Sequence, residues 1–153
     1  MDPLFLSLDE VLEVHRDQIE RYGGTLGIRD QALLESALAA PQSGFGGHYL
    51  HGDLYEMAAA YLFHLVQNHP FLDGNKRVGA ATALTFLVMN GIETRIPNEA
   101  LAQMVLSVAQ GKTDKTPSPN SFVSTHVIEW TYCSKFGRNQ RRRESFLGAG
   151  SRY

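Results

Sequence analysis

Two apolar helical segments joined by one short polar loop constrain the fold of this chain most. From Asp53 to Val66 the predicted helix is apolar on nearly all sides, which is the pattern of a helix buried in the centre of a fold. A second helix is predicted from about Gly74 to Met89, with a stop at Asn90-Gly91. Pro70 cannot continue the first helix, so it separates the two. We therefore expect an all-α fold built around a central buried helix.

Further helices are predicted before and after this pair. Ser7 and Glu10 form a capping box, and the apolar spacing that follows is helical up to Gly23-Gly24. The other predicted helices run from about Arg29 to Ala40, where Pro41 ends the helix, and from a start at Pro97 and Asn98 through Leu101 to Ala109. There is no repeat and no alternating strand pattern longer than a few residues, so we expect a compact helical bundle.

Charge divides the chain into two parts. Residues 1–111 hold 6 Lys+Arg against 13 Asp+Glu, whereas 112–153 hold 8 against 3, although the net charge is only -2. Thr113 to Ser121 has the composition of a linker, a short helix is predicted around Phe122 to Tyr132, and Arg138 to Tyr153 has few large apolar residues. We expect a folded domain over residues 1–112, followed over 113–153 by a linker, a short helix and a flexible basic tail.

The composition also predicts where the chain works. No segment reaches the roughly 20 apolar residues that cross a bilayer, and an acid stands at Asp2, where a signal peptide needs basic residues. The lone Cys133 cannot form an internal disulfide. We expect a cytoplasmic protein that does not contact the membrane.

The loop between the two apolar helices concentrates residues that suit phosphate chemistry. It reads His69-Pro70-Phe71-Leu72-Asp73-Gly74-Asn75-Lys76-Arg77. Amide groups at a helix N-terminus have no intrahelical partner, and Gly74 lets the backbone approach an anion. Lys76 and Arg77 add positive charge, and His69 can accept a hydroxyl proton near neutral pH. The pattern favours phosphoryl or nucleotidyl transfer.

Other interpretations of these residues remain open. Asp73 suits a divalent cation or the orientation of an attacking group, but it also suits a cap for the next helix. A histidine after a buried helix is usually structural, and Lys-Arg at a helix start is usually a solvated face. We expect Phe71 to anchor the loop in the core. The histidines at 48, 51 and 64 do not have the spacing of an established metal site.

The segment from His69 to Arg77 resembles the signature of the Fic/Doc family, in which histidine and phenylalanine are followed by an acid, a small residue and asparagine. Gly27-Ile28-Arg29-Asp30 and Leu33 to Leu38 resemble the N-terminal part of its death-on-curing (Doc) branch. The resemblance covers about residues 5–111. It implies a Fic/Doc-type helical bundle that acts on nucleotide phosphates.

Two positions favour the Doc branch over the adenylylating Fic proteins. Typical Fic proteins have a glycine and an arginine where this chain has Lys76 and Ala80. Lys76 fills space that glycine leaves open among the amides, and Ala80 removes a bidentate phosphate clamp. The resemblance implies that ATP binds in the opposite orientation to that in adenylylating Fic proteins, with its γ-phosphate next to the acceptor. It therefore implies a protein kinase. An adenylyltransferase and a non-catalytic module that binds a partner or RNA are the alternatives.

The resemblance also implies roles and partners. His69 would be the general base, Asp73 the Mg²⁺ ligand and Phe71 a structural anchor, while the ATP phosphates would be held by Gly74, Asn75, Lys76 and Arg77. The loop formed by Phe45, Gly46, Gly47, His48 and Tyr49 corresponds to the flap that aligns the backbone of the target. The implied substrate is elongation factor Tu, at a threonine.

An inhibitory helix of the kind found in many Fic proteins has no match, because Thr125 and Glu129 are followed by Trp130. We therefore expect a separate Phd-type antitoxin, which would lay a short helix into a groove of this protein and form a toxin-antitoxin pair. Nucleic acid is not an expected partner except through the basic cluster Arg138 to Arg143.

Overall fold

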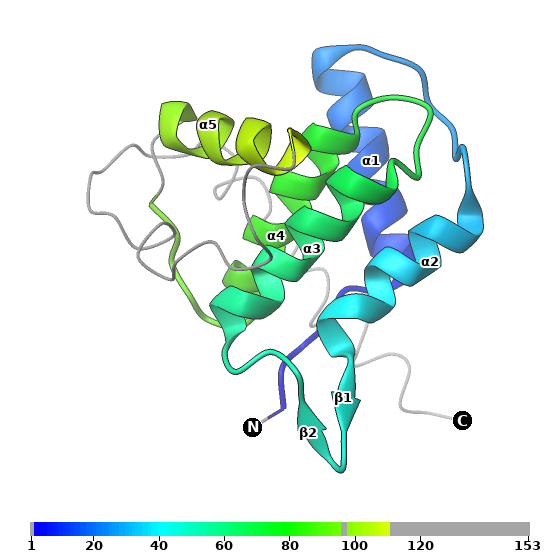
Figure 1. Cartoon of the computed structure of the whole chain (residues 1–153). Helices are drawn as coiled ribbons and strands as arrows, with labels where there is room; N and C mark the ends of the chain where they lie inside the picture. Colours follow the sequence, from blue (N-terminus) through cyan, green and yellow to red (C-terminus); the bar gives the residue numbers. More distant parts are fainter. Residues whose placement is uncertain (1, 96–97, 111–153) are drawn as a thin grey trace, which may run out of the picture.

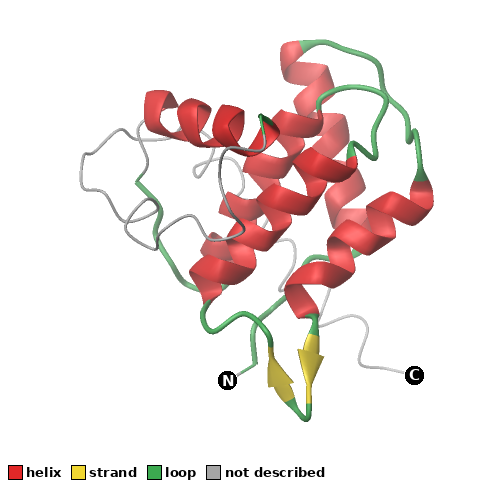
Figure 2. Cartoon of the chain, in the orientation of Figure 1, coloured by secondary structure: helices red, strands yellow, loops and turns green. Residues whose placement is uncertain are grey.

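The computed structural model describes residues 2–95 and 98–110, and these residues form a helical bundle (Figure 1). Its α-helices are α1 Leu8–Tyr22, α2 Gln31–Ala39, α3 Leu54–Asn68, α4 Asn75–Met89 and α5 Asn98–Ala109. A short 3₁₀ helix, η1 Ala40–Gln42, leads into an antiparallel hairpin of β1 Gly44–Phe45 and β2 His48–Tyr49. Figure 2 shows how small this hairpin is beside the helices, and the predicted all-α fold is confirmed.

Helices α3 and α4 lie side by side in the middle of the bundle (Figure 1). Their backbones come close at Gly79, where a Cβ atom would lie 2.9 Å from Val66 Cγ2 and 3.3 Å from the carbonyl oxygen of Leu62. Helix α1 packs on α4, α2 packs on α3, and α5 contacts both central helices. The core is therefore centred on α3, as predicted, but α4 shares the central position.

Capping residues explain where the helices begin. Ser7 and Glu10 form the predicted capping box of α1. The side chain of Asp53 accepts a hydrogen bond of 2.8 Å from the backbone N–H of Glu56 and so starts α3. These short polar side chains satisfy amide groups that the helix itself leaves unpaired, which is why they could be read from the sequence.

The helix ends differ more from the predictions. Helix α3 ends at Asn68, before Pro70, because His69 already has a left-handed backbone. Helix α2 ends at Ala39, and Pro41 lies inside η1 rather than directly stopping α2. Gly91 has a φ of 81° just after the C-cap of α4, which is the predicted glycine stop.

The predictions for residues 112–153 lie outside the described residues, and the domain boundary at residue 112 stays a prediction. Within the described part of the chain, every helix is too short or too polar to cross a bilayer.

The close contact at Gly79 generates a prediction about stability. We expect Gly79→Ala to lower the free energy of unfolding by about 1 kcal/mol, because overpacking a core costs about 1–3 kcal/mol and alanine returns about 1 kcal/mol of helix propensity. Urea unfolding measures the difference. The matched control is Gly52→Ala, where the nearest atom to a new Cβ is Glu56 Oε2 at 3.5 Å; it should change stability by less than about 0.5 kcal/mol. Equal stability of the Gly79→Ala variant and the wild type would contradict the prediction, because the cost of overpacking would then be no larger than the gain in helix propensity.

Candidate functional site

The α3–α4 loop, residues 69–74, is held by the segment that connects α1 to α2 (Figure 1). The backbone N–H groups of Arg29 and Asp30 both donate to the carbonyl of Pro70, at 2.7 and 3.0 Å. The N–H of Leu72 donates to the carbonyl of Gly27 at 3.0 Å, next to an antiparallel bridge between residues 28 and 71. Residues 70–72 of the loop are therefore paired like a short strand.

The interior of the loop is closed by Phe71 and Asn75. Both residues are buried, and the N–H of Phe71 donates to Asn75 Oδ1 at 2.8 Å while Asn75 Nδ2 donates to the carbonyl of Phe71 at 3.0 Å. Oδ1 and Nδ2 of Asn75 are thus each engaged once by the loop, and each keeps one further hydrogen-bonding position. The backbone N–H of this predicted phosphate-holding residue makes no hydrogen bond within the described residues.

His69 stands at the start of the loop in a left-handed conformation, with φ 52° and ψ 51°. Among the described residues it is the one non-glycine residue with a positive φ. Such a conformation is uncommon for residues with a side chain and is often retained at functional sites. The residue is exposed, so its imidazole can meet a bound molecule.

Asp73 lies at the other end of the loop and is also exposed. Its Oδ1 accepts from the N–H of Gly74 at 2.7 Å, and its Oδ2 accepts from the N–H of Thr25 at 3.3 Å. Gly24 makes room for the carboxylate, because a Cβ there would lie 2.5 Å from Asp73 Oδ2. The N-cap of α4 is Gly74, and no side chain caps this helix, so the interpretation of Asp73 as a helix cap does not hold.

The carboxylate of Asp73 fits a magnesium ion. Each of its oxygens accepts one hydrogen bond and keeps further lone-pair capacity. Magnesium usually binds one or two carboxylates together with phosphate oxygens and water. The described residues contain no group of three or more His, Cys, Asp and Glu that could hold a metal ion, so a cation at Asp73 would also need oxygen atoms from its ligand.

The first turn of α4 offers amide groups for an anion. Gly74 has a φ of 79°, and the first backbone hydrogen bond of the helix runs from Val78 N–H to the carbonyl of Gly74 at 2.9 Å. Within the described part of the chain, the N–H groups of residues 75–77 meet no acceptor. Lys76 is exposed beside them. This is the arrangement with which helix N-termini bind phosphate.

Arg77 has a different environment from Lys76. Its guanidinium donates to the carbonyls of Gln18 at 3.2 Å and Gly23 at 3.0 Å, and it lies 6.0 Å from the ring centroid of Tyr22. Arg77 therefore covers carbonyls at the C-terminal end of α1 in this structure. To hold a phosphate as predicted, it would have to release at least part of this contact.

The hairpin that contains residues 45–49 is not brought together with the loop. The ring of Tyr49 lies 5.6 Å from that of Phe5, which stacks on Phe86 near the end of α4. His69 and the loop lie at the other end of α3 and α4, and 15-residue helices are about 22 Å long. Figure 1 shows the hairpin and the α3–α4 loop at opposite ends of the bundle. Instead, residues 24–30 lie beside the loop.

Sequence reasoning missed a role for His15 of α1. Its ring is buried, stacks on Phe71 at 3.9 Å between centroids, and donates from Nε2 to the carbonyl of Asp73 at 3.0 Å. Burial lowers the pKa of His15, and the positive charge of Arg77 acts in the same direction against the hydrogen bond to Asp73. A polar ring at the apolar spacing of α1 was the one available indication.

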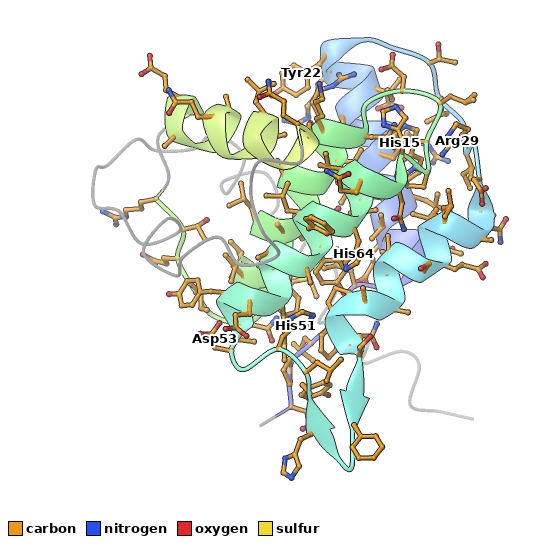
Figure 3. All side chains as sticks on the ribbon, in the orientation of Figure 1. His15, Tyr22, Arg29, His51, Asp53 and His64 are labelled. Atoms are coloured by element: carbon orange, nitrogen blue, oxygen red, sulfur yellow. The ribbon has the colours of Figure 1, made fainter. Side chains whose placement is uncertain are left out.

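Arg29 is a second residue whose role was missed. Its guanidinium donates to the carbonyls of His69 at 2.6 Å and Asn68 at 2.9 Å. Figure 3 shows Arg29 and His15 at the end of the molecule that carries the loop, whereas His51 and Asp53 lie at the other end. The sequence showed that Arg29 precedes a helix but not which carbonyls it would meet.

Comparison with known proteins assigns the chain to a family. The Fic/DOC family model matches residues 5–87, and the chain therefore belongs to the Fic/Doc family. Two proteins that it resembles carry the name Doc. It is 44% identical over 72 residues to "Toxin Doc" of Mycolicibacterium smegmatis, a match that covers 47% of this chain and 55% of that protein. It is 32% identical over 107 residues to "Protein kinase doc" of Escherichia phage P1, covering 70% of this chain and 83% of the phage protein.

The buried His15 generates a prediction about pH. In the unfolded chain its pKa would be near ~6.5, and the folded value is lower, so the unfolded state takes up a proton first as the pH falls. The free energy of unfolding should therefore fall as the pH drops below about 6.5. His15→Gln cannot titrate and should lose this part of the pH dependence.

Urea unfolding of the full chain between pH 5 and pH 7.5 tests this. The control is His48→Gln, an exposed histidine in β2, which should keep the slope of the wild type. Parallel stability curves for the wild type and His15→Gln would contradict the assignment.

Proposed function

We propose that this chain is a Doc-type toxin that transfers the γ-phosphate of ATP to a hydroxyl of a translation factor, elongation factor Tu, and so arrests growth. The names of its relatives, a Doc toxin and a Doc protein kinase, support this reading. It would act in the cytoplasm and be held inactive by a Phd-type antitoxin.

One observation carries the proposal. A single loop presents an exposed histidine at its first residue, an exposed carboxylate at Asp73 and the uncapped amide groups of α4 directly after it. These are a candidate base, a candidate cation ligand and an anion site, the three elements that phosphoryl transfer uses.

The proposed reaction follows from this arrangement. The oxygen of the target hydroxyl attacks the γ-phosphorus, and the bond from that phosphorus to the oxygen it shares with the β-phosphate breaks, so that ADP leaves. His69 takes the hydroxyl proton. The amide groups of α4 and the ammonium of Lys76 hold the phosphates. A magnesium ion, when bound at Asp73, supplies neutralisation of charge on the phosphate oxygens.

The surroundings of Ala80 support transfer of the γ-phosphate rather than AMP. Ala80 lies in α4 about one turn after Lys76 and is only 8% exposed. Adenylylating Fic proteins have an arginine at this position that clamps phosphate, whereas this chain has an alanine that is packed in the core. Lys76 adds a side chain where such proteins have glycine. Both features argue against the nucleotide pose that presents the α-phosphate.

The backbone at Ile28 supports a way of aligning the target. In its bridge with Phe71 the flanking residues make the hydrogen bonds, and within the described residues the N–H and C=O of Ile28 make none. This leaves an exposed strand edge beside the loop, to which a target segment would add as a further strand. We therefore assign target alignment to residues 24–29 instead of the hairpin at residues 45–49.

The test is transfer of label from ATP to bacterial lysate in the presence of magnesium. We expect γ-label to enter one band of the size of an elongation factor and α-label to enter none. Transfer by His69→Ala should fall by at least about 100-fold, since general acid–base catalysis contributes about 10²–10⁴-fold. The matched control is His48→Ala, an exposed histidine at the other end of the molecule, which should transfer normally.

The other outcomes separate the alternatives. Incorporation of α-label would mean that the chain is an adenylyltransferase and that Lys76 does not dictate the pose of the nucleotide. Absence of both labels, together with growth arrest that survives His69→Ala, would indicate a binding module.

A further inference from the structure

The side chain of Arg29 makes two contacts that the proposed function does not use. Its Nε donates to the carbonyl of His69 at 2.6 Å, and its Nη2 donates to the carbonyl of Asn68 at 2.9 Å. Its backbone N–H donates to the carbonyl of Pro70 at 2.7 Å. One residue therefore binds three consecutive carbonyls at the point where α3 ends and the loop begins.

The contacts of Arg29 satisfy unpaired carbonyl groups at the C-terminal end of α3. The last carbonyls of a helix have no intrahelical donors and carry partial negative charge, which a guanidinium satisfies. Hydrogen bonds from a charged donor are stronger than neutral ones. The side chain of Asn68 adds a tie to α2, because its Nδ2 donates to the carbonyl of Leu33 at 3.0 Å.

We propose that Arg29 is a positioning residue that fixes His69 in its left-handed conformation and so directs the imidazole toward the acceptor hydroxyl. The direction of the His69 carbonyl depends on its ψ angle, so a guanidinium bound to that carbonyl and to the preceding one selects a single backbone conformation. Without it, His69 would be free to relax toward the regions that non-glycine residues prefer. The kinetic part of the proposal rests on the proposed function, but the conformational part does not.

A positioning role can be distinguished from a merely structural one, which would lower the stability of the fold and all activities together. Arg29 is exposed, so its removal leaves no buried cavity, and α2 and α3 keep the contact through Asn68. The ATP phosphates are assigned to the first turn of α4, which Arg29 does not touch. Loss of Arg29 should therefore reduce the rate of transfer and leave nucleotide binding intact.

The experiment compares Arg29→Ala and Arg29→Lys with the wild-type full chain. The planar fork of arginine reaches both carbonyls at once, whereas lysine is a single point charge, so Lys should restore activity only in part. For Arg29→Ala we expect kcat to fall about 10- to 100-fold, as for small displacements of a catalytic group. The KM for ATP and the affinity for Mg·ADP, measured by calorimetry, should stay within about 2-fold of the wild-type values. The reason is that Arg29 does not contribute to nucleotide binding in either the ground state or the transition state.

The matched control is Arg16→Ala, an exposed arginine of α1 for which the described residues show no hydrogen bond or ion pair. It should keep the kcat of the wild type. A fall in kcat that tracks the loss of folded protein, or an unchanged kcat in Arg29→Ala, would overturn the positioning role.

A second measurement does not depend on activity. The nuclear Overhauser effect between the amide and α protons of His69 reports the sign of its φ angle, because these protons lie closer together at the φ of 52° found here than at any negative φ. We expect this signal to weaken in Arg29→Ala and to be preserved in Arg16→Ala. An unchanged signal would overturn the proposal even where kcat falls. If the wild-type chain transfers no γ-phosphate, the proposed function fails, and this signal still decides whether Arg29 fixes His69.

Discussion

The two hydrogen bonds between the side chain of Asn75 and the backbone of Phe71 determine how the rest of the site is arranged. They lie in the core, where unpaired polar groups are costly, and they close the turn between α3 and α4. Because the bonds between Asn75 and Phe71 hold the turn together, the side chains at its two ends do not have to stabilise it. His69 and the first turn of α4 can therefore face solvent while Phe71 stays buried against His15. The same bonds explain why an asparagine stands at this point of the motif, since its carboxamide both donates to and accepts from the backbone of Phe71.

The helix ends around the site differ in whether side chains satisfy their unpaired backbone groups. The C-terminal carbonyls of α3 are covered by Arg29, and those of α1 are covered by Arg77. The N-terminus of α4 has no side-chain cap. Leaving a helix end without partners is unfavourable unless water or a ligand satisfies it. The open, partly positive end of α4 therefore suits the anion that the proposed function places there. This asymmetry links the stability of the bundle to the chemistry proposed for it.

Local features of the fold could be predicted from the sequence, and contacts between distant segments could not. Ser7 and Asp53 start helices through their own side chains, and Gly91 ends one through its backbone, so neighbours in sequence were sufficient. The left-handed conformation of His69 depends on its surroundings, and so does the position of the hairpin. Periodicity shows that residues 44–49 interrupt the helices, but it does not show at which end of the bundle they pack. The aromatic contacts of Tyr49 and Phe5 decide that, and they join segments 44 positions apart.

The exposure of the site limits what the described residues can do alone. His69, Asp73 and Lys76 are all open to solvent, so water could compete with a target hydroxyl for the γ-phosphate. Enzymes usually exclude water by closing a lid over the reacting groups. Here the hairpin lies at the far end of α3, and the segment beside the loop is already fixed to it by hydrogen bonds. Among residues 2–95 and 98–110 nothing is placed to close over the site, so in the proposed reaction the bound target, aligned along the open edge at Ile28, would supply a shielding surface. Such shielding would favour a protein substrate over a free hydroxyl compound, which could not cover the site.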